Sequence, residues 1–201
     1  MKKIGILGGS FNPIHKGHID LAMYALNTFK FDEVMLIPAK IPPHKSADNL
    51  VSESHRLKMC QLATENLPIK VSDIELKMEG ASYSYRTLEK LKLEHPDWDL
   101  WLICGTDMFM SLLNWRYPER IFKSASIAGV RRQGDEFDDY DDMSKMKSKL
   151  EENGAKVKIG QADILEISST YIRECVKNDI PLENYVDKSV IDYIYKNKLY
   201  R

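Results

Sequence analysis

The sequence GGSFNPIHKGHI, residues 8–19, decides the fold of the first part of the chain. An apolar run, KIGIL (3–7), precedes it. After it, apolar residues recur at helical spacing, namely Ile19, Ala22, Ala25, Leu26 and Phe29. The glycines and Pro13 separate the two patterns with a tight turn. We therefore predict a strand over 3–7, a turn, and a helix over 18–29.

The same alternation of short aliphatic runs and longer amphipathic segments continues along the chain. Further strands are predicted at 34–39, 69–76, 100–104, 126–130 and 157–160. Further helices are predicted at 52–66, with Ser52 as N-cap, and at 82–95, 134–154, 169–177 and 188–197, with Asp187 as N-cap of the last. Strands that alternate with helices form a parallel sheet covered on both faces. The fold class is α/β: a Rossmann-like doubly wound parallel sheet with a helical C-terminal end, in a single domain over 1–201.

Composition excludes several classes of protein. The net charge is −1, which argues against wrapping nucleic acid or binding an anionic membrane. No run approaches the roughly 18 apolar residues of a membrane span, and Gly8 and Pro13 interrupt the N-terminal apolar run too early for a signal peptide. The three cysteines lie far apart, which is typical of a reduced protein. We expect a cytoplasmic protein, and the sequence leaves its oligomeric state open.

The stretch 8–19 also has the properties of a phosphate site. Its glycines allow close approach of backbone to ligand, and the helix that follows directs free N–H groups at the same place. His15 and His18 add donors or positive charge there. The pattern is neither GxGxxG nor GxxxxGK, and HKGH lacks the glutamate of HExxH, so we expect no metal ligand among the protein side chains. A polyphosphate is the predicted ligand.

Two other segments carry candidate site residues. In ISSTYIR (167–173), Ser168 or Ser169 can cap a helix that has Arg173 on the same face, which makes a second anion clamp. In CGTDM (104–108), Gly105 permits close approach and Asp107 can accept hydrogen bonds from ribose hydroxyls. The alternatives are an ordinary serine cap with a surface arginine, and an N-cap aspartate.

The motif GSFNPIHKGH resembles the (H/T)xGH signature of the nucleotidyltransferase superfamily, and GGSFNPIH is the form found in bacterial nicotinate-nucleotide adenylyltransferases. The resemblance continues in the family's order through PAKIPPHK, ASYSYRTL, LICGTDM, NW and ISSTYIR. It implies transfer of an adenylyl group from ATP to nicotinate mononucleotide, giving nicotinate adenine dinucleotide and pyrophosphate. It also implies Mg²⁺ carried by ATP, and no redox cofactor.

The resemblance assigns roles to individual residues. The implied catalytic residues are His15, His18 and Arg173. The implied ATP-binding residues are Gly9, Ser10, Phe11, His15, His18, Gly105, Asp107, Ile167, Ser168, Ser169, Thr170 and Arg173. The implied mononucleotide-binding residues are Asn12, Lys45, Ser84, Tyr85, Thr87, Trp115, Arg131 and Arg132. For Lys45 and Trp115 the alternatives are a solvated loop lysine and a core tryptophan.

The sequence departs from the family at two places on the mononucleotide side. Arg86 stands where family members commonly have aspartate, and RRQGD (131–135) replaces an Arg-Pro-Gly turn. Arg86 would either strengthen anion binding or point to solvent. Two other functions stay open: another adenylyltransferase, such as a pantetheine-phosphate adenylyltransferase, and a regulator that binds ATP without turnover. The preference between nicotinate and nicotinamide mononucleotide is also open.

Overall fold

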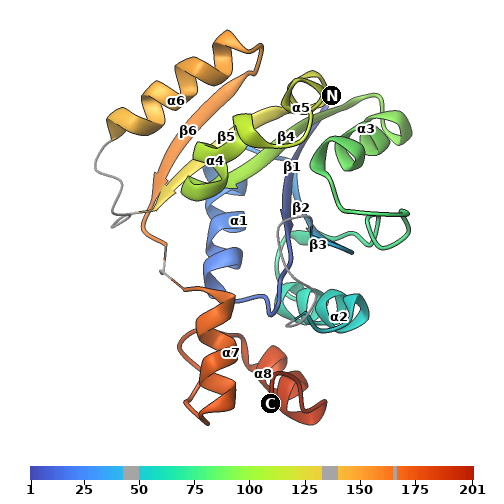
Figure 1. Ribbon diagram of the computed structural model, residues 1–201, viewed down its shortest axis with the longest axis vertical. Coiled ribbons are helices and arrows are strands. Elements are labelled where there is room, and N and C mark those ends of the chain that lie inside the picture. Colours follow the sequence, from blue (N-terminus) through green and yellow to red (C-terminus); the bar gives the residue numbers. More distant parts are fainter. Residues whose placement is uncertain (43–49, 133–139, 165–166) are drawn as a thin grey trace.

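A parallel sheet with helices on both faces forms the centre of the computed structural model, which describes residues 1–42, 50–132, 140–164 and 167–201 (Figure 1). Its described part has six strands in the order β3-β2-β1-β4-β5-β6, and every neighbouring pair is parallel. The strands are β1 (Lys2–Gly9), β2 (Glu33–Pro38), β3 (Ile69–Val71), β4 (Trp98–Gly105), β5 (Ser126–Arg132) and β6 (Val157–Ala162). The predicted α/β fold with a doubly wound parallel sheet is confirmed.

The helices divide between the two faces of the sheet. One face packs against α1 (Lys16–Thr28) and α2 (Glu53–Thr64), and the core on this side continues to α7 (Ser169–Lys177) and α8 (Lys188–Lys196), which lie beyond the strand ends. The other packs against α3 (Ser84–Glu94), α4 (Thr106–Ser111), α5 (Pro118–Ser124) and α6 (Tyr140–Glu152). None of the helices in the described ranges has the length and apolar character needed to cross a bilayer.

The central strands supply side chains to both cores because successive residues of a strand point to opposite faces. In β4, Leu100 and Leu102 belong to the core under α3–α6, whereas Trp101 and Ile103 belong to the core under α1, α2, α7 and α8. Such a strand is apolar at every position, which is why LWLIC (100–104) reads as one continuous hydrophobic run.

The structure departs from the predicted elements at several places beyond small shifts of their ends. The strand predicted over 69–76 ends at Val71, because a turn follows in which Leu76 N–H donates to the carbonyl of Asp73. The short helices α4 and α5 lie where none was predicted. Ser52 occupies the N-cap position of α2, but its hydroxyl bonds the hydroxyl of Ser54 rather than a helix amide. The helix predicted over 134–154 covers Tyr140–Glu152; residues 133–139 lie outside the described residues.

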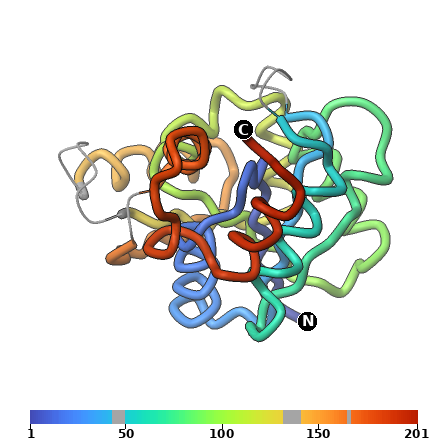
Figure 2. The backbone as a smooth tube through the Cα atoms, turned by 90° about the horizontal axis from the view of Figure 1, so that it is seen from below, coloured from blue at the N-terminus to red at the C-terminus, as the bar shows by residue number. Residues whose placement is uncertain are grey.

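The strand order creates a switch point between β1 and β4, the two adjacent strands at the centre of the sheet. The chain leaves β1 toward β2 on one side and leaves β4 toward β5 on the other, so a crevice opens between their carboxyl ends. Gly9 ends β1 and Gly105 ends β4. Helices α7 and α8 lie below this edge in Figure 1, and Figure 2, seen from below, shows the C-terminal segment lying across it.

A fully buried arginine on α2 holds the loops at this edge together. The guanidinium of Arg56 donates to four backbone carbonyls: Val51 at 3.1 Å, Ser10 at 2.9 Å, Ala39 at 2.6 Å and Lys40 at 3.2 Å. These carbonyls belong to the segments that follow β1 and β2 and to Val51, two residues before α2. Burial lowers the pKa of Arg56 from its ordinary value, which is so high that the group stays charged at neutral pH.

Replacing this arginine should destabilise the protein. Arg56→Ala leaves buried carbonyls without donors, at a cost of about 3–5 kcal/mol. Because 1 kcal/mol corresponds to roughly 2–4 °C in a chain of this size, we expect Tm to fall by about 10 °C in a thermal unfolding experiment. Lys58→Ala, an exposed position on the same helix, is the control and should change Tm little. Equal effects of the two substitutions would contradict the clamp.

Candidate active site

The loop after β1 has a shape that its glycines make possible. Phe11 is buried and has φ of 44°, a left-handed conformation that non-glycine residues rarely adopt. A Cβ on Gly9 would lie 2.9 Å from the Phe11 ring, so this position has no room for a side chain. A Cβ on Gly8 would meet nothing within 4 Å. The side of Gly8 is therefore open space at the carboxyl edge of the sheet.

The two histidines of this loop lie against each other at the start of α1. His15 is the N-cap residue and is buried; its ring stacks on that of His18 with centroids 3.7 Å apart. The backbone N–H of His15 donates to Nδ1 of His18 at 3.3 Å. A nitrogen that accepts a hydrogen bond carries no proton, so the ring proton of His18 is on Nε2. This tautomer presents an N–H donor at the opposite side of the ring.

The start of α7 is bonded to the same loop. Ser169 donates its hydroxyl proton to the carbonyl of Pro13 at 2.9 Å, and Nη1 of Arg173 donates to the carbonyl of Asn12 at 3.0 Å. Nη2 of Arg173 donates to the Thr170 hydroxyl at 3.1 Å. The structure therefore brings Arg173 and the N-terminus of α7 to the histidine loop, although more than 150 residues separate them in sequence.

Other residues predicted for ATP lie at the same edge or beneath it. Ser168 is the N-cap of α7 and accepts from the N–H of Tyr171 at 3.1 Å. Ile167 is buried in the core, so only its backbone is available to a ligand. Gly105 is the N-cap of α4, which leaves Asp107 exposed in the first turn rather than at the cap. The alternative of an N-cap aspartate is therefore wrong.

The residues predicted for the mononucleotide lie mainly on the face of α3–α6. Helix α3 begins at Ser84, so the first-turn amides of Ser84 and Tyr85 have no acceptor within the helix. Trp115 packs at the edge of this core and donates from Nε1 to the Ser111 hydroxyl at 3.2 Å. Arg131 lies near the end of β5, two strands from β1. Arg132 ends that strand, and Lys45 lies outside the described residues.

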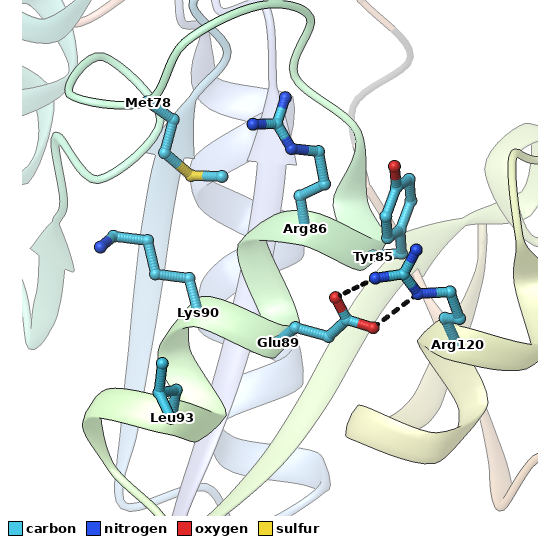
Figure 3. Close-up of a pocket in the computed structure, with 7 residues that line it drawn as sticks. All are labelled: Met78, Tyr85, Arg86, Glu89, Lys90, Leu93 and Arg120. Carbon is cyan, nitrogen blue, oxygen red and sulfur yellow. Dashed lines mark hydrogen bonds and ion pairs between the residues drawn. The ribbon is translucent and has the colours of Figure 1, made fainter.

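Arg86 is half-buried, and one nitrogen of its guanidinium is bonded within its own loop. Its guanidinium donates to the carbonyls of Glu79 at 2.8 Å and Ala81 at 3.4 Å, which braces the loop before α3. It also lines a pocket of about 340 Å³ on the outer side of α3 (Figure 3). Glu89 and Arg120 form a two-bond ion pair in this pocket, at 2.7 and 2.6 Å. Of the predicted site residues that the structure describes, only Tyr85 lines it.

Sequence reasoning missed a buried carboxylate beside the predicted mononucleotide residues. Glu75 accepts a hydrogen bond of 2.6 Å from the Thr87 hydroxyl, and both side chains are buried. Burial raises the pKa of Glu75 above its ordinary value, against the opposing effects of hydrogen bonds from Thr87 and Ser82 and the charge of Arg56. The Thr87 hydroxyl is thus engaged with the protein itself.

The raised pKa of Glu75 predicts how stability depends on pH. Since the folded-state pKa exceeds the unfolded value, the buried carboxylate costs stability once the pH rises through the folded-state pKa. We expect Glu75→Gln to raise Tm relative to the unmodified protein at pH 8, by more than it does at pH 4. Differential scanning calorimetry at both pH values checks this.

Glu79→Gln is the matched control, since Glu79 is an exposed carboxylate in the same loop. Its Tm difference from the unmodified protein should be nearly the same at both pH values. An equal difference at pH 8 and pH 4 for Glu75→Gln would contradict the assignment of a buried charge.

Comparison with known proteins finds relatives that match this chain over almost its whole length. The sequence model of the cytidylyltransferase-like family matches residues 6–175. The probable nicotinate-nucleotide adenylyltransferase of Carboxydothermus hydrogenoformans is 37% identical over 200 residues, covering 99% of this chain and 98% of the relative. That of Lachnoclostridium phytofermentans is 34% identical over 201 residues and covers 100% of both.

Solved structures share the fold. The nicotinic acid mononucleotide adenylyltransferase of Plasmodium falciparum, complexed with NaAD, has a TM-score of 0.79 at 24% identity, covering 100% of this chain and 98% of that one. A putative nicotinate-nucleotide adenylyltransferase from Vibrio parahaemolyticus has a TM-score of 0.69 at 22% identity, covering 100% of this chain and 96% of that one. With its histidine loop bonded to the ISSTYIR helix start, and with these full-length relatives, the chain belongs to the nicotinate-nucleotide adenylyltransferase family of cytidylyltransferase-like nucleotidyltransferases.

Proposed function

We propose that this protein transfers the adenylyl group of ATP to nicotinate mononucleotide, with residues 1–201 acting as one nucleotidyltransferase domain in the cytoplasm. The observation that carries the proposal is the junction of two helix N-termini at one loop, through Ser169 to Pro13 and Arg173 to Asn12. Helix N-termini, imidazoles and a guanidinium together form a site for a chain of phosphates. The full-length relatives named for this activity support it.

The chemistry requires alignment and charge neutralisation rather than a general base. The acceptor phosphate is already an anion near neutral pH. One of its oxygens forms a bond to the α-phosphorus of ATP, the bond from that phosphorus to the bridging oxygen of the β-phosphate breaks, and pyrophosphate leaves with the bonding electrons. Because one anion must approach another, donors placed around the α-phosphate and the leaving group lower the barrier.

In this proposal each group at the edge has one task. His18 donates from Nε2 to the α-phosphate, since its Nδ1 accepts from the His15 backbone. His15 lies along the phosphate chain. Arg173 and the amides of 168–170 bind the departing pyrophosphate. Gly9, Gly105 and Asp107, at or just after the carboxyl ends of β1 and β4, are assigned to the rest of ATP.

The donors at this edge suit ATP that carries its own Mg²⁺. They are N–H groups, imidazoles and a guanidinium, which neutralise phosphate oxygens but do not ligate magnesium. Magnesium, when bound, supplies further charge neutralisation on the phosphates. The residues of this chain then hold the phosphate oxygens and align the acceptor. The reaction changes no oxidation state, so it requires no redox cofactor.

The acceptor site is proposed on the face of α3–α6. The Trp115 ring stacks on the pyridine ring, and the amides of Ser84 and Tyr85 bind its carboxylate. Thr87 contributes through its neighbours, because its hydroxyl donates to Glu75. The remaining predicted residues serve the ribose and the phosphate of the mononucleotide: Asn12, Lys45, Arg131 and Arg132.

An assay of pyrophosphate release tests the function directly. ATP should give pyrophosphate only when a pyridine mononucleotide is also present, and parallel reactions with the nicotinate and nicotinamide forms show which one is preferred. Release of pyrophosphate with phosphopantetheine as the acceptor would instead indicate a pantetheine-phosphate adenylyltransferase. Binding of ATP with no release under any condition would refute the proposed transfer and favour the regulator.

His18→Ala should reduce kcat by about 100-fold or more with the fold intact, because one preorganised donor to the reacting phosphate is lost. His95→Ala is the control, since His95 follows α3 near the start of β4, at the opposite end of the strands. Steady-state kinetics and thermal unfolding of both variants provide the check. Activity of His18→Ala near that of the unmodified enzyme would refute the role assigned to His18.

Gly8→Ala tests whether the open space beside β1 receives substrate. The new methyl group meets no protein atom within 4 Å, so Tm should change little. Gly8 points to the same face of the sheet as Ile4 and Ile6, which pack in the core with α3 and beside Trp115. We therefore expect KM for the mononucleotide to rise by about tenfold, a loss of 1.4 kcal/mol, and KM for ATP to rise less. Unchanged KM values for both would show that the space is not used.

A further inference from the structure

The side chain of Tyr200 lies against the histidine loop. Its hydroxyl donates to Oδ1 of Asn12 at 2.9 Å. After α8 ends at Lys196, the buried Leu199 anchors the segment, and its N–H donates to the carbonyl of Ile194 at 3.0 Å. Tyr200 itself has φ of 65°, in the left-handed region that side chains disfavour. The contact with Asn12 is therefore made by a segment held in an unusual backbone conformation.

Asn12 is the centre of several hydrogen bonds at this place. Its Oδ1 accepts from Tyr200 and also from the backbone N–H of Val51 at 3.3 Å. Its backbone carbonyl accepts from Nη1 of Arg173 at 3.0 Å. An amide oxygen has two lone pairs, and both acceptor directions of Oδ1 are used here. The two donors fix which end of the amide faces the protein, so the NH₂ group has a fixed direction.

We infer that Tyr200 is a positioning residue for adenylyl transfer, which fixes the side chain of Asn12 in the loop whose backbone binds Arg173. The inference rests on the proposed function. Without the hydroxyl, Oδ1 loses one of the two donors that set the direction of the amide. The Asn12 side chain, which is proposed to serve the mononucleotide, then loses part of its fixed orientation beside the loop that binds Arg173.

The phenol is suited to remain a donor. Burial raises the pKa of Tyr200 above its ordinary value, with Arg173 and Arg56 opposing the rise. The hydroxyl therefore keeps its proton across the neutral and mildly alkaline range in which such an enzyme is assayed. Asn12 is buried as well, so water does not compete freely for Oδ1.

Tyr200→Phe removes only this hydroxyl and is the first variant to test. We expect kcat/KM for pyrophosphate formation to fall by five- to tenfold, which is the effect of about one lost hydrogen bond. Tyr193→Phe is the matched control: the Tyr193 hydroxyl bonds Nδ1 of His55 at 2.9 Å, where α8 packs on α2. It should lower Tm by an amount similar to Tyr200→Phe but leave kcat/KM within twofold. Equal kcat/KM for the two variants would overturn the inference.

A double-mutant cycle shows whether Tyr200 acts through Asn12. In an Asn12→Ala background the acceptor is gone, so adding Tyr200→Phe should change kcat/KM by less than twofold. If the two losses instead multiply, Tyr200 acts independently of Asn12 and the inference is wrong. A purely structural role would show in Tm and not in this non-additivity.

A measurement without turnover separates this inference from the proposed function. The side-chain amide of Asn12 gives its own pair of ¹⁵N–¹H resonances. Tyr200→Phe should shift this pair, and Tyr193→Phe should not. An unmodified protein that releases no pyrophosphate would refute the proposed function, and the amide resonances would still show whether Tyr200 orients Asn12. No shift in Tyr200→Phe would overturn the inference.

Discussion

The candidate site depends on a few hydrogen bonds to the carbonyls of Asn12 and Pro13. Ser169 and Arg173 donate to them, and these bonds join the N-terminus of α7 directly to the loop that carries the stacked histidines. The sheet supplies the rest of the geometry, since its switch point brings the ends of β1 and β4 together. A site for several phosphates needs donors from more than one element, and this loop is where three parts of the chain meet.

Much of this arrangement was predictable because it depends on local pattern. Strands buried on both faces give continuous apolar runs such as 100–104, and Ser168 and Asp187 cap α7 and α8 as their residue types indicate. The elements that escaped prediction are short. Helices α4 and α5 have 6 and 7 residues, which is fewer than two turns each and too short for a periodic pattern of apolar residues.

The residues missed at the site share another property: their partners are distant in sequence. Arg56 stands at helical spacing from the buried Met59 and Cys60, which is the one sign in the local sequence that it faces inward. The local sequence does not indicate which carbonyls it binds. The local sequence likewise gives no sign of the partners of Glu75 and Tyr200, which become known only from the fold. Arg86 shows the converse, since a departure from the family motif serves the backbone of its own loop.

The partners of Asn12 come from positions 51, 173 and 200, which has a consequence for the order in which the chain acquires its structure. On the ribosome, β1 and the histidine loop emerge early, while the hydroxyl that completes the environment of Asn12 is added nearly 190 residues later. Contacts of such long sequence separation form late in folding because they close large loops. A nascent chain can therefore build most of its sheet before the loop gains its final bonding partner, and catalytic competence would be among the last properties to arise during synthesis.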